Sequence, residues 1–107
     1  MNNFPVKTQD VTPVTVVFRK FYNGETIAIF PYEIVTNNGM VNSYQHVGQH
    51  GPASISIVNN TELAKENEYS LLKRELESIG YALEVKKKIN YKKYLLAKKE
   101  TFTKMCH

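Results

Sequence analysis

The sequence has little of what marks a secreted, membrane-spanning or disulfide-bonded protein. Its single cysteine, Cys106, has no partner for an intrachain disulfide. No stretch approaches the roughly 20 apolar residues of a membrane-spanning helix, and the N-terminus lacks the basic start and apolar run of a signal peptide. We therefore expect a cytoplasmic protein that makes no contact with membranes.

Motifs for catalysis and for cofactor binding are missing as well. The serines lack a Gly-x-Ser-x-Gly context, and the chain has no Walker-type or dinucleotide-binding glycine fingerprint. Neither Cys-x-x-Cys nor His-Glu-x-x-His is present to supply metal ligands. The sequence predicts no catalytic residue, no metal site and no cofactor. It argues against an enzyme, although a hydrolase that uses histidine or a metal stays open.

Basic residues are unevenly distributed along the chain. The 107 residues include 14 Lys and Arg against 10 Asp and Glu, a formal net charge of +4. Residues 1–80 carry six basic and eight acidic side chains, a net −2, whereas residues 81–107 carry eight lysines and two glutamates, a net +6. Any attraction for a polyanion should therefore reside in the C-terminal quarter.

The length and the 42% hydrophobic content fit one globular domain. Residues 1–13 include two prolines and show no sustained period, which predicts a loose N-terminal arm. Residues 14–90 are expected to form a single α+β domain, followed by a basic amphipathic helix or tail over residues 91–107. The thin apolar stripe of that helix leaves open whether it packs on the domain.

Two hairpins are predicted in the first half of the domain. Residues 14–21 and 26–30 are rich in β-branched and aromatic side chains, and Asn23-Gly24 between them is typical of a type I′ turn. A second pair of strands is predicted over residues 33–36 and 40–46, around another turn. Alternation places one set of side chains on the face expected to be core: Val14, Val16 and Phe18.

Prolines and glycines interrupt this region at two places. Pro31 indicates an edge, a bulge or an early end of its strand. Gly48, Gly51 and Pro52 indicate a loop, and residues 54–58 are expected to form a short strand or an extended connection.

The clearest helix is predicted for residues 66–79, where apolar side chains recur at spacings of three and four: Tyr69, Leu72, Leu76 and Ile79. Gly80 suits the left-handed residue that ends a helix. Residues 81–89 then alternate, which predicts a strand returning to the sheet. The fold class is therefore α+β, with two layers: an antiparallel sheet of about four strands, made of two hairpins plus a return strand, covered by one main helix.

Residues 44–51 concentrate histidine, glycine and amide side chains in eight positions. Two imidazoles are too few ligands for a zinc site. The spacing of Gly48 and Gly51 matches the Gly-x-x-Gly loop of KH-type RNA-binding modules, but a sharp turn explains it more simply, because strand-like residues precede it. Polar loops commonly carry binding sites. We expect a macromolecular partner to contact this loop, at Tyr44, Gln45, His46, Gly48, Gln49, His50 and Gly51.

The alternative is nonspecific nucleic-acid binding through the C-terminal segment. Lysines neutralise phosphates, and tyrosines stack on unpaired bases. The segment contains no arginine, the side chain that base recognition generally prefers. A lysine-rich face is often simply a solvated one, and the tyrosines also fit the apolar stripe of the last helix. The candidate residues are Lys86, Lys87, Lys88, Tyr91, Lys92, Lys93, Tyr94, Lys98 and Lys99.

Several blocks of the chain carry a resemblance to known sequences: Val16–Phe21, Ile27–Pro31, Ser43–Gly51, Glu68–Glu77 and Ile79–Tyr81. On these blocks the chain resembles a family of small uncharacterised proteins encoded by bacteriophages and mobile elements, notably of gut Bacteroidetes. Ser-Tyr-Gln-His-Val-Gly-Gln-His-Gly is the most specific block, and the resemblance covers roughly residues 14–90. One departure is Lys65-Glu66, where the family pattern has Thr-Pro at the helix start.

The resemblance implies an accessory protein of a phage or mobile element, in the cytoplasm of a bacterial host, and no catalytic residue. Together with the polar loop, it leads to the hypothesis of a small non-enzymatic protein that binds a host or phage protein. One version would be an inhibitor of a host defence or of a host enzyme.

Overall fold

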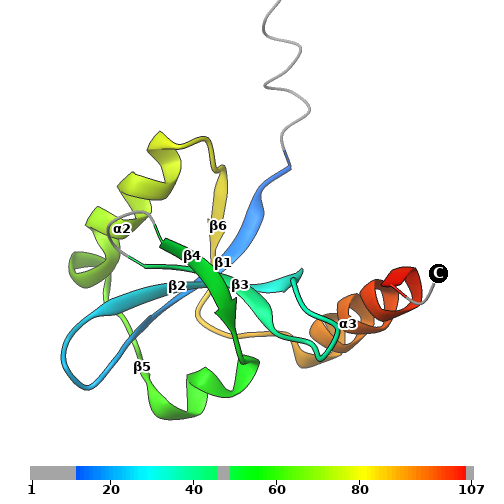
Figure 1. Cartoon of the computed structure of the whole chain (residues 1–107). Coiled ribbons are helices and arrows are strands. Elements are labelled where there is room, and N and C mark those ends of the chain that lie inside the picture. Colours follow the sequence, from blue (N-terminus) through cyan, green and yellow to red (C-terminus); the bar gives the residue numbers. More distant parts are fainter. Residues whose placement is uncertain (1–11, 46–48, 106–107) are drawn as a thin grey trace, which may run out of the picture.

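The computed structural model describes residues 12–45 and 49–105, and it confirms the α+β class (Figure 1). One mixed sheet has the strand order β4-β3-β2-β1-β5, and β6 pairs with the other half of β1. The elements are β1 (Val14–Lys20), β2 (Thr26–Ile34), β3 (Val41–Gln45), β4 (Gln49–Ala53), the 3₁₀ helix η1 (Ile55–Asn60), β5 (Glu62–Leu63), α2 (Glu66–Ser78), β6 (Leu83–Val85) and α3 (Tyr91–Met105). The expected four strands are therefore six.

The turn between β1 and β2 lies where it was predicted but has a different form. The amide of Gly24 donates to the carbonyl of Phe21 at 2.9 Å, and Gly24 has a φ of +91°. Gly24 is thus the fourth residue of a β-turn, whereas a type I′ turn would place Asn23-Gly24 at its two centre positions. The longer loop still reverses the chain because glycine adopts the left-handed conformation without a steric cost.

Strand β2 continues through Pro31, which is fully buried. The register against β3 shifts between Phe30 and Ile34, so the proline sits at an irregularity of the kind that accommodates a missing N–H donor. Of the strand predicted over residues 33–36, the first two residues are the end of β2 and the last two follow it, and the second hairpin joins β2 to β3.

The region after β3 differs most from expectation. Residues 49–53, predicted as a loop, form the edge strand β4, where Pro52 is tolerated because an edge needs fewer ladder donors. Residues 55–60 are a 3₁₀ helix, and the hydroxyl of Ser54 accepts from the amide of Ser56 at 3.2 Å to cap it. Pairing with β3 makes β4 a strand in spite of its glycine and proline.

Helix α2 follows its prediction closely. Leu72 and Leu76 are buried, and Gly80 ends the helix with a φ of +110° while the amide of Tyr81 donates to the carbonyl of Leu76 at 3.1 Å. Ile79 is the exception, because it lies beyond the last helical residue and is 56% exposed. The return strand β6 is short and pairs parallel to β1, whereas an antiparallel strand was expected.

Both faces of the sheet are covered, so the core has two parts where the two-layer prediction had one. On the first face, Phe18, Phe30 and Leu76 form a cluster beneath α2. On the second face, Ile29 and Val41 pack with side chains of η1 and with Tyr94 of α3. Val17, which alternates along β1 with the side chains expected to form the core, is only 1% exposed for this reason.

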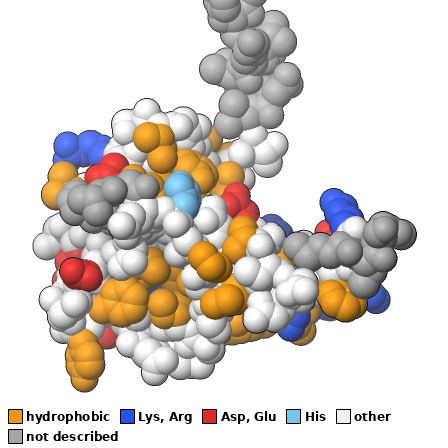
Figure 2. All heavy atoms as spheres, in the orientation of Figure 1, with side chains coloured by type: hydrophobic (Ala, Val, Ile, Leu, Met, Phe, Trp, Pro, Cys, Tyr) orange, Lys and Arg blue, Asp and Glu red, His pale blue; other side chains and the backbone are white. Residues whose placement is uncertain are grey.

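The first turns of α3 dock on the second face, which answers the question that the sequence left open. Tyr94 is 6% exposed, and its hydroxyl donates to the carbonyl of Gly39 at 2.7 Å. The hydroxyl of Tyr32 accepts from the amide of Asn90 at 2.9 Å. The rest of the helix projects from the body (Figure 1), and lysine and apolar side chains are exposed along it (Figure 2). The exposed apolar residues include Leu95, Leu96 and Phe102.

Candidate docking site

The predicted contact loop is the hairpin of β3 and β4. Tyr44 and Gln45 end β3, and Gln49, His50 and Gly51 begin β4, while His46 and Gly48 lie outside the described residues. The register places Tyr44 opposite His50 and Gln45 opposite Gln49. Because neighbouring residues of a strand point to opposite faces, these two pairs project on different sides of the sheet. The predicted residues therefore do not form one surface.

Tyr44 links the hairpin to α2. It is 2% exposed, and its hydroxyl donates to Oε1 of Glu75 at 2.8 Å. The imidazole of His50 packs edge-on against the Tyr44 ring, with centroids 4.7 Å apart, and its own side chain stays exposed. The Tyr81 ring lies 6.0 Å from the imidazole. Tyr44 is thus unavailable to a partner, whereas His50 lies at the exposed rim of the first-face cluster.

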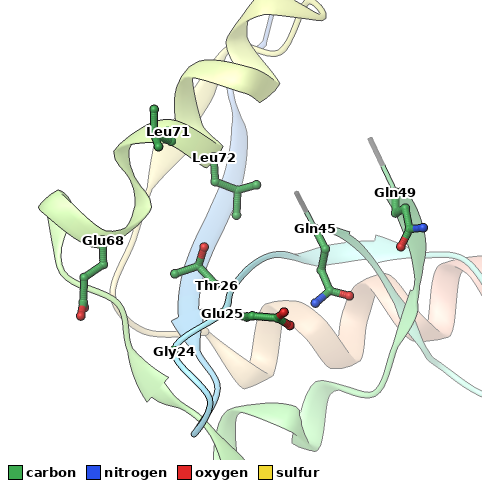
Figure 3. A pocket seen from close by; sticks show the side chains of 8 residues that line it. All are labelled: Gly24, Glu25, Thr26, Gln45, Gln49, Glu68, Leu71 and Leu72. Carbon is green, nitrogen blue, oxygen red and sulfur yellow. The ribbon is translucent and has the colours of Figure 1, made fainter. Parts of the chain in front are cut away.

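A groove of about 480 Å³ opens where the hairpin ends (Figure 3). Three elements far apart in sequence form it: the turn between β1 and β2, the first turns of α2, and the ends of β3 and β4. Leu72 points into it, and the side chains of Glu25 and Gln45 point toward each other in the view of Figure 3. Its lining is Gly24, Glu25, Thr26, Gln45, Gln49, Glu68, Leu71 and Leu72. We call this the hairpin groove.

Only Gln45 and Gln49 of the hairpin groove were among the predicted contact residues. The glycine turn and the helix were both recognised from the sequence, but nothing in either pattern says that they meet the hairpin. One usable signal was Leu71, an apolar residue off the buried stripe of its helix, and it is 69% exposed in the structure. Its exposure gives the groove an apolar contact next to the amides of Gln45 and Gln49.

The start of α2, which forms one wall of the groove, is held by Glu68. Its Oε2 accepts from Nζ of Lys20 at 2.7 Å, and its Oε1 accepts from the amide of Lys65 at 2.8 Å. Lys65 stands at the N-cap position, but its ammonium has no acceptor to offer the helix, so only half of a capping box forms. The hydrogen bond from Lys20 lowers the pKa of the Glu68 carboxyl, and the same bond raises the pKa of Lys20.

Acid should weaken the protein partly through Glu68. Because the folded-state pKa of this carboxyl is lowered, its stabilisation is fully present above its ordinary pKa of about 4.3. It is lost as the pH falls through the folded-state value. The loss of stability caused by Glu68→Gln should therefore be greatest near neutral pH and shrink toward about pH 3. Urea unfolding of both proteins across this range measures it.

Glu66→Gln is the matched control, since Glu66 occupies the same first turn of α2 and no ion pair holds it in the part of the chain that the structure describes. Its effect on stability should vary less with pH. Identical pH profiles for the two variants would show that the Lys20–Glu68 pair contributes nothing particular.

The chemistry of the groove suits binding. Amide side chains donate and accept hydrogen bonds, Glu25 supplies a carboxylate, and Leu71 and Leu72 supply apolar contact area. Across residues 12–45 and 49–105, no three His, Cys, Asp or Glu side chains gather in a way that would hold a metal ion. No helix in this part of the chain is long and apolar enough to cross a membrane.

Comparisons with protein-family models, curated proteins and solved structures found no match. The functional argument therefore rests on the site itself.

The candidate residues of the alternative prediction divide into those whose side chains have a partner inside the protein and those whose side chains make no hydrogen bond, ion pair or ring contact in the described part of the chain. Tyr94 cannot stack on a base, because it is buried and bonded to Gly39. The Lys98 side chain lies over Gly39, where an added Cβ would meet its Cε at 2.8 Å, and the Lys93 ammonium lies 4.6 Å from the centre of the Tyr32 ring. The Lys86 ammonium is 3.7 Å from the Glu84 carboxylate. The remaining candidates are exposed: Lys87, Lys88, Tyr91, Lys92 and Lys99.

Proposed function

We propose that this protein is a small non-enzymatic accessory protein of a bacteriophage or mobile element, and that it docks on a host protein through the hairpin groove. The observation that carries the proposal is the groove itself. It gathers amides, a carboxylate and an exposed leucine from three separate elements. An inhibitor of a host defence or of a host enzyme is one form that such a docking protein takes.

The lining indicates the chemistry of the partner. Gln45 and Gln49 offer both donors and acceptors, which suits the backbone of an extended segment. Glu25 and Glu68 make the groove acidic, although the Glu68 carboxylate already has Lys20 as its partner. Leu71 is exposed to receive an apolar side chain. The partner should therefore present an extended segment that carries at least one basic and one apolar side chain.

Photo-crosslinking tests this docking directly. A benzophenone side chain at position 71 should form a covalent adduct with the partner in cells of a gut Bacteroidetes host, and mass spectrometry identifies the adduct. The same side chain at position 96 is the matched control, because Leu96 is also an exposed leucine on a helix, at 58% against 69% for Leu71. The adduct should be specific to position 71.

A pull-down with variants of the groove completes the test. Gln45→Ala/Gln49→Ala/Leu71→Ala should reduce recovery of the crosslinked protein in pull-down by about tenfold, because hot-spot contacts dominate such interfaces. Leu95→Ala/Leu96→Ala/Lys99→Ala should leave it unchanged. The proposal fails if both positions yield the same adducts, or if both triple variants recover the partner equally.

A further inference from the structure

A second hollow, of about 270 Å³, lies on the second face of the sheet and shares no residue with the hairpin groove. Its polar lining comes from β1, from the segment that leads to α3, and from the first residue of α3: Arg19, Lys87, Lys88 and Tyr91. Val17 and Val58 form apolar walls. The fold thus brings an arginine from the acidic part of the sequence next to the lysines of the basic part.

Arg19 is held in place by η1 and by Thr61, the residue that follows it. Its Nε donates to Oγ1 of Thr61 at 3.0 Å, and its Nη2 donates to the carbonyl of Val58 at 2.8 Å and to that of Thr61. In the described part of the chain, Nη1 makes no hydrogen bond, so it is left to receive a ligand. A guanidinium fixed in this way loses little side-chain entropy when it binds an anion.

The hollow is positively charged. Burial lowers the pKa of Arg19, while the nearby Glu62 carboxylate raises it, and the guanidinium stays protonated in either case. Glu62 is the carboxylate that acts on Arg19. The lining of the hollow holds three cations: Arg19, Lys87 and Lys88. The excess of two positive charges suits a phosphate group.

Tyr91 adds an aromatic face to the same hollow. It is 50% exposed and lines the hollow together with Arg19. An exposed aromatic ring next to paired cations is the combination with which proteins bind single-stranded nucleic acids, because the base stacks while the phosphate is neutralised. A base within a duplex is already stacked and is not available to this ring.

We propose that this hollow binds single-stranded nucleic acid, with one phosphate between Arg19 and Lys87-Lys88 and a neighbouring base stacked on Tyr91. The exposed lysines of α3 extend the contact along the strand. Sequence is not read, because the proposed contacts are to a phosphate and to the face of a base, and neither differs enough between bases to select one.

Fluorescence anisotropy with a labelled single-stranded oligothymidine tests the proposal on the full chain. Lys87→Gln/Lys88→Gln should weaken binding about tenfold at low salt, and it should reduce the slope of log Kd against log salt by about 0.7, as expected for one lost phosphate contact on a single strand. Tyr91→Ala should weaken binding about fivefold with little change in that slope.

Lys65→Gln/Arg74→Gln is the matched control, because it also removes two exposed positive charges. Lys65 stands at the N-cap of α2, and Arg74 lies within that helix. It should change Kd less than about twofold. The proposal is overturned if the wild type does not bind at low salt, if the two double variants weaken binding equally, or if Tyr91→Ala has no effect. Duplex DNA or anionic vesicles that bind as tightly as the single strand would also overturn it, since both lack a free base.

Discussion

Replacing Tyr94 with Ala should lower the free energy of unfolding by about 3 kcal/mol, the range for removing a large aromatic side chain from a core. The ring is 6% exposed in the second-face cluster, and its hydroxyl donates to the carbonyl of Gly39 at 2.7 Å. The variant loses the packing and leaves that carbonyl without its donor. Urea unfolding measures the loss, and trypsin should cleave the lysine-rich α3 faster once its anchor is gone.

Two further variants separate the contributions. Tyr91→Ala, on the same helix but half exposed, should cost less than about 0.5 kcal/mol, as is usual for surface substitutions. Tyr94→Phe keeps the ring and should cost about 1 kcal/mol for the hydrogen bond alone. If Tyr94→Ala were no more destabilising than Tyr91→Ala, α3 would not depend on this anchor.

Replacing Leu76 with Ala should destabilise the protein by about 2–5 kcal/mol, because the side chain is wholly buried between α2 and the sheet. Phe18 and Phe30 belong to the same first-face cluster, and a close-packed core closes only part of the space that a lost isobutyl group leaves. Thermal or urea unfolding measures the change. The affinity of the folded variant for the partner should stay unchanged, because Leu76 does not line the hairpin groove.

Leu71→Ala is the internal reference for this prediction. It removes the same atoms from the same helix, but at a position that is 69% exposed, so stability should change by less than about 0.5 kcal/mol. Equal effects at the two positions would contradict the placement of the apolar stripe. Loss of partner binding without loss of stability in Leu71→Ala would in turn support docking at the hairpin groove.

Local patterns predicted the elements whose stability is mainly local. The stripe of Leu72 and Leu76 located α2, and Gly80 located its end, because a glycine at that position lowers the cost of a left-handed residue wherever the helix packs. The first hairpin was found for a similar reason, although the form of its turn was not. There, the choice between turns depends on how the flanking strands pair, as well as on Asn23-Gly24.

Elements that depend on pairing with distant residues were missed. Strand β4 contains Gly51 and Pro52, which are poor strand formers, and it exists because β3 supplies a partner for each of its residues. The second buried face was missed because alternation along β1 cannot show that η1 and α3 cover the side opposite α2. In the same way, the sequence left open whether Tyr94 contacts nucleic acid or belongs to the apolar stripe of its helix, and the structure shows it to be the buried anchor of that helix.

By itself, the sequence determined that this chain forms an α+β domain with a clear amphipathic helix, a polar segment over residues 44–51 and a basic C-terminal segment, because periodicity and composition are properties of neighbouring residues. Tertiary structure alone decided which of these features meet. It placed Gln45 and Gln49 beside Leu71 and Glu25, and it placed Arg19 beside Lys87 and Lys88. The division of charge along the chain is thus only partly a division in space, because strand pairing sets which side chains share a surface whatever their separation in sequence.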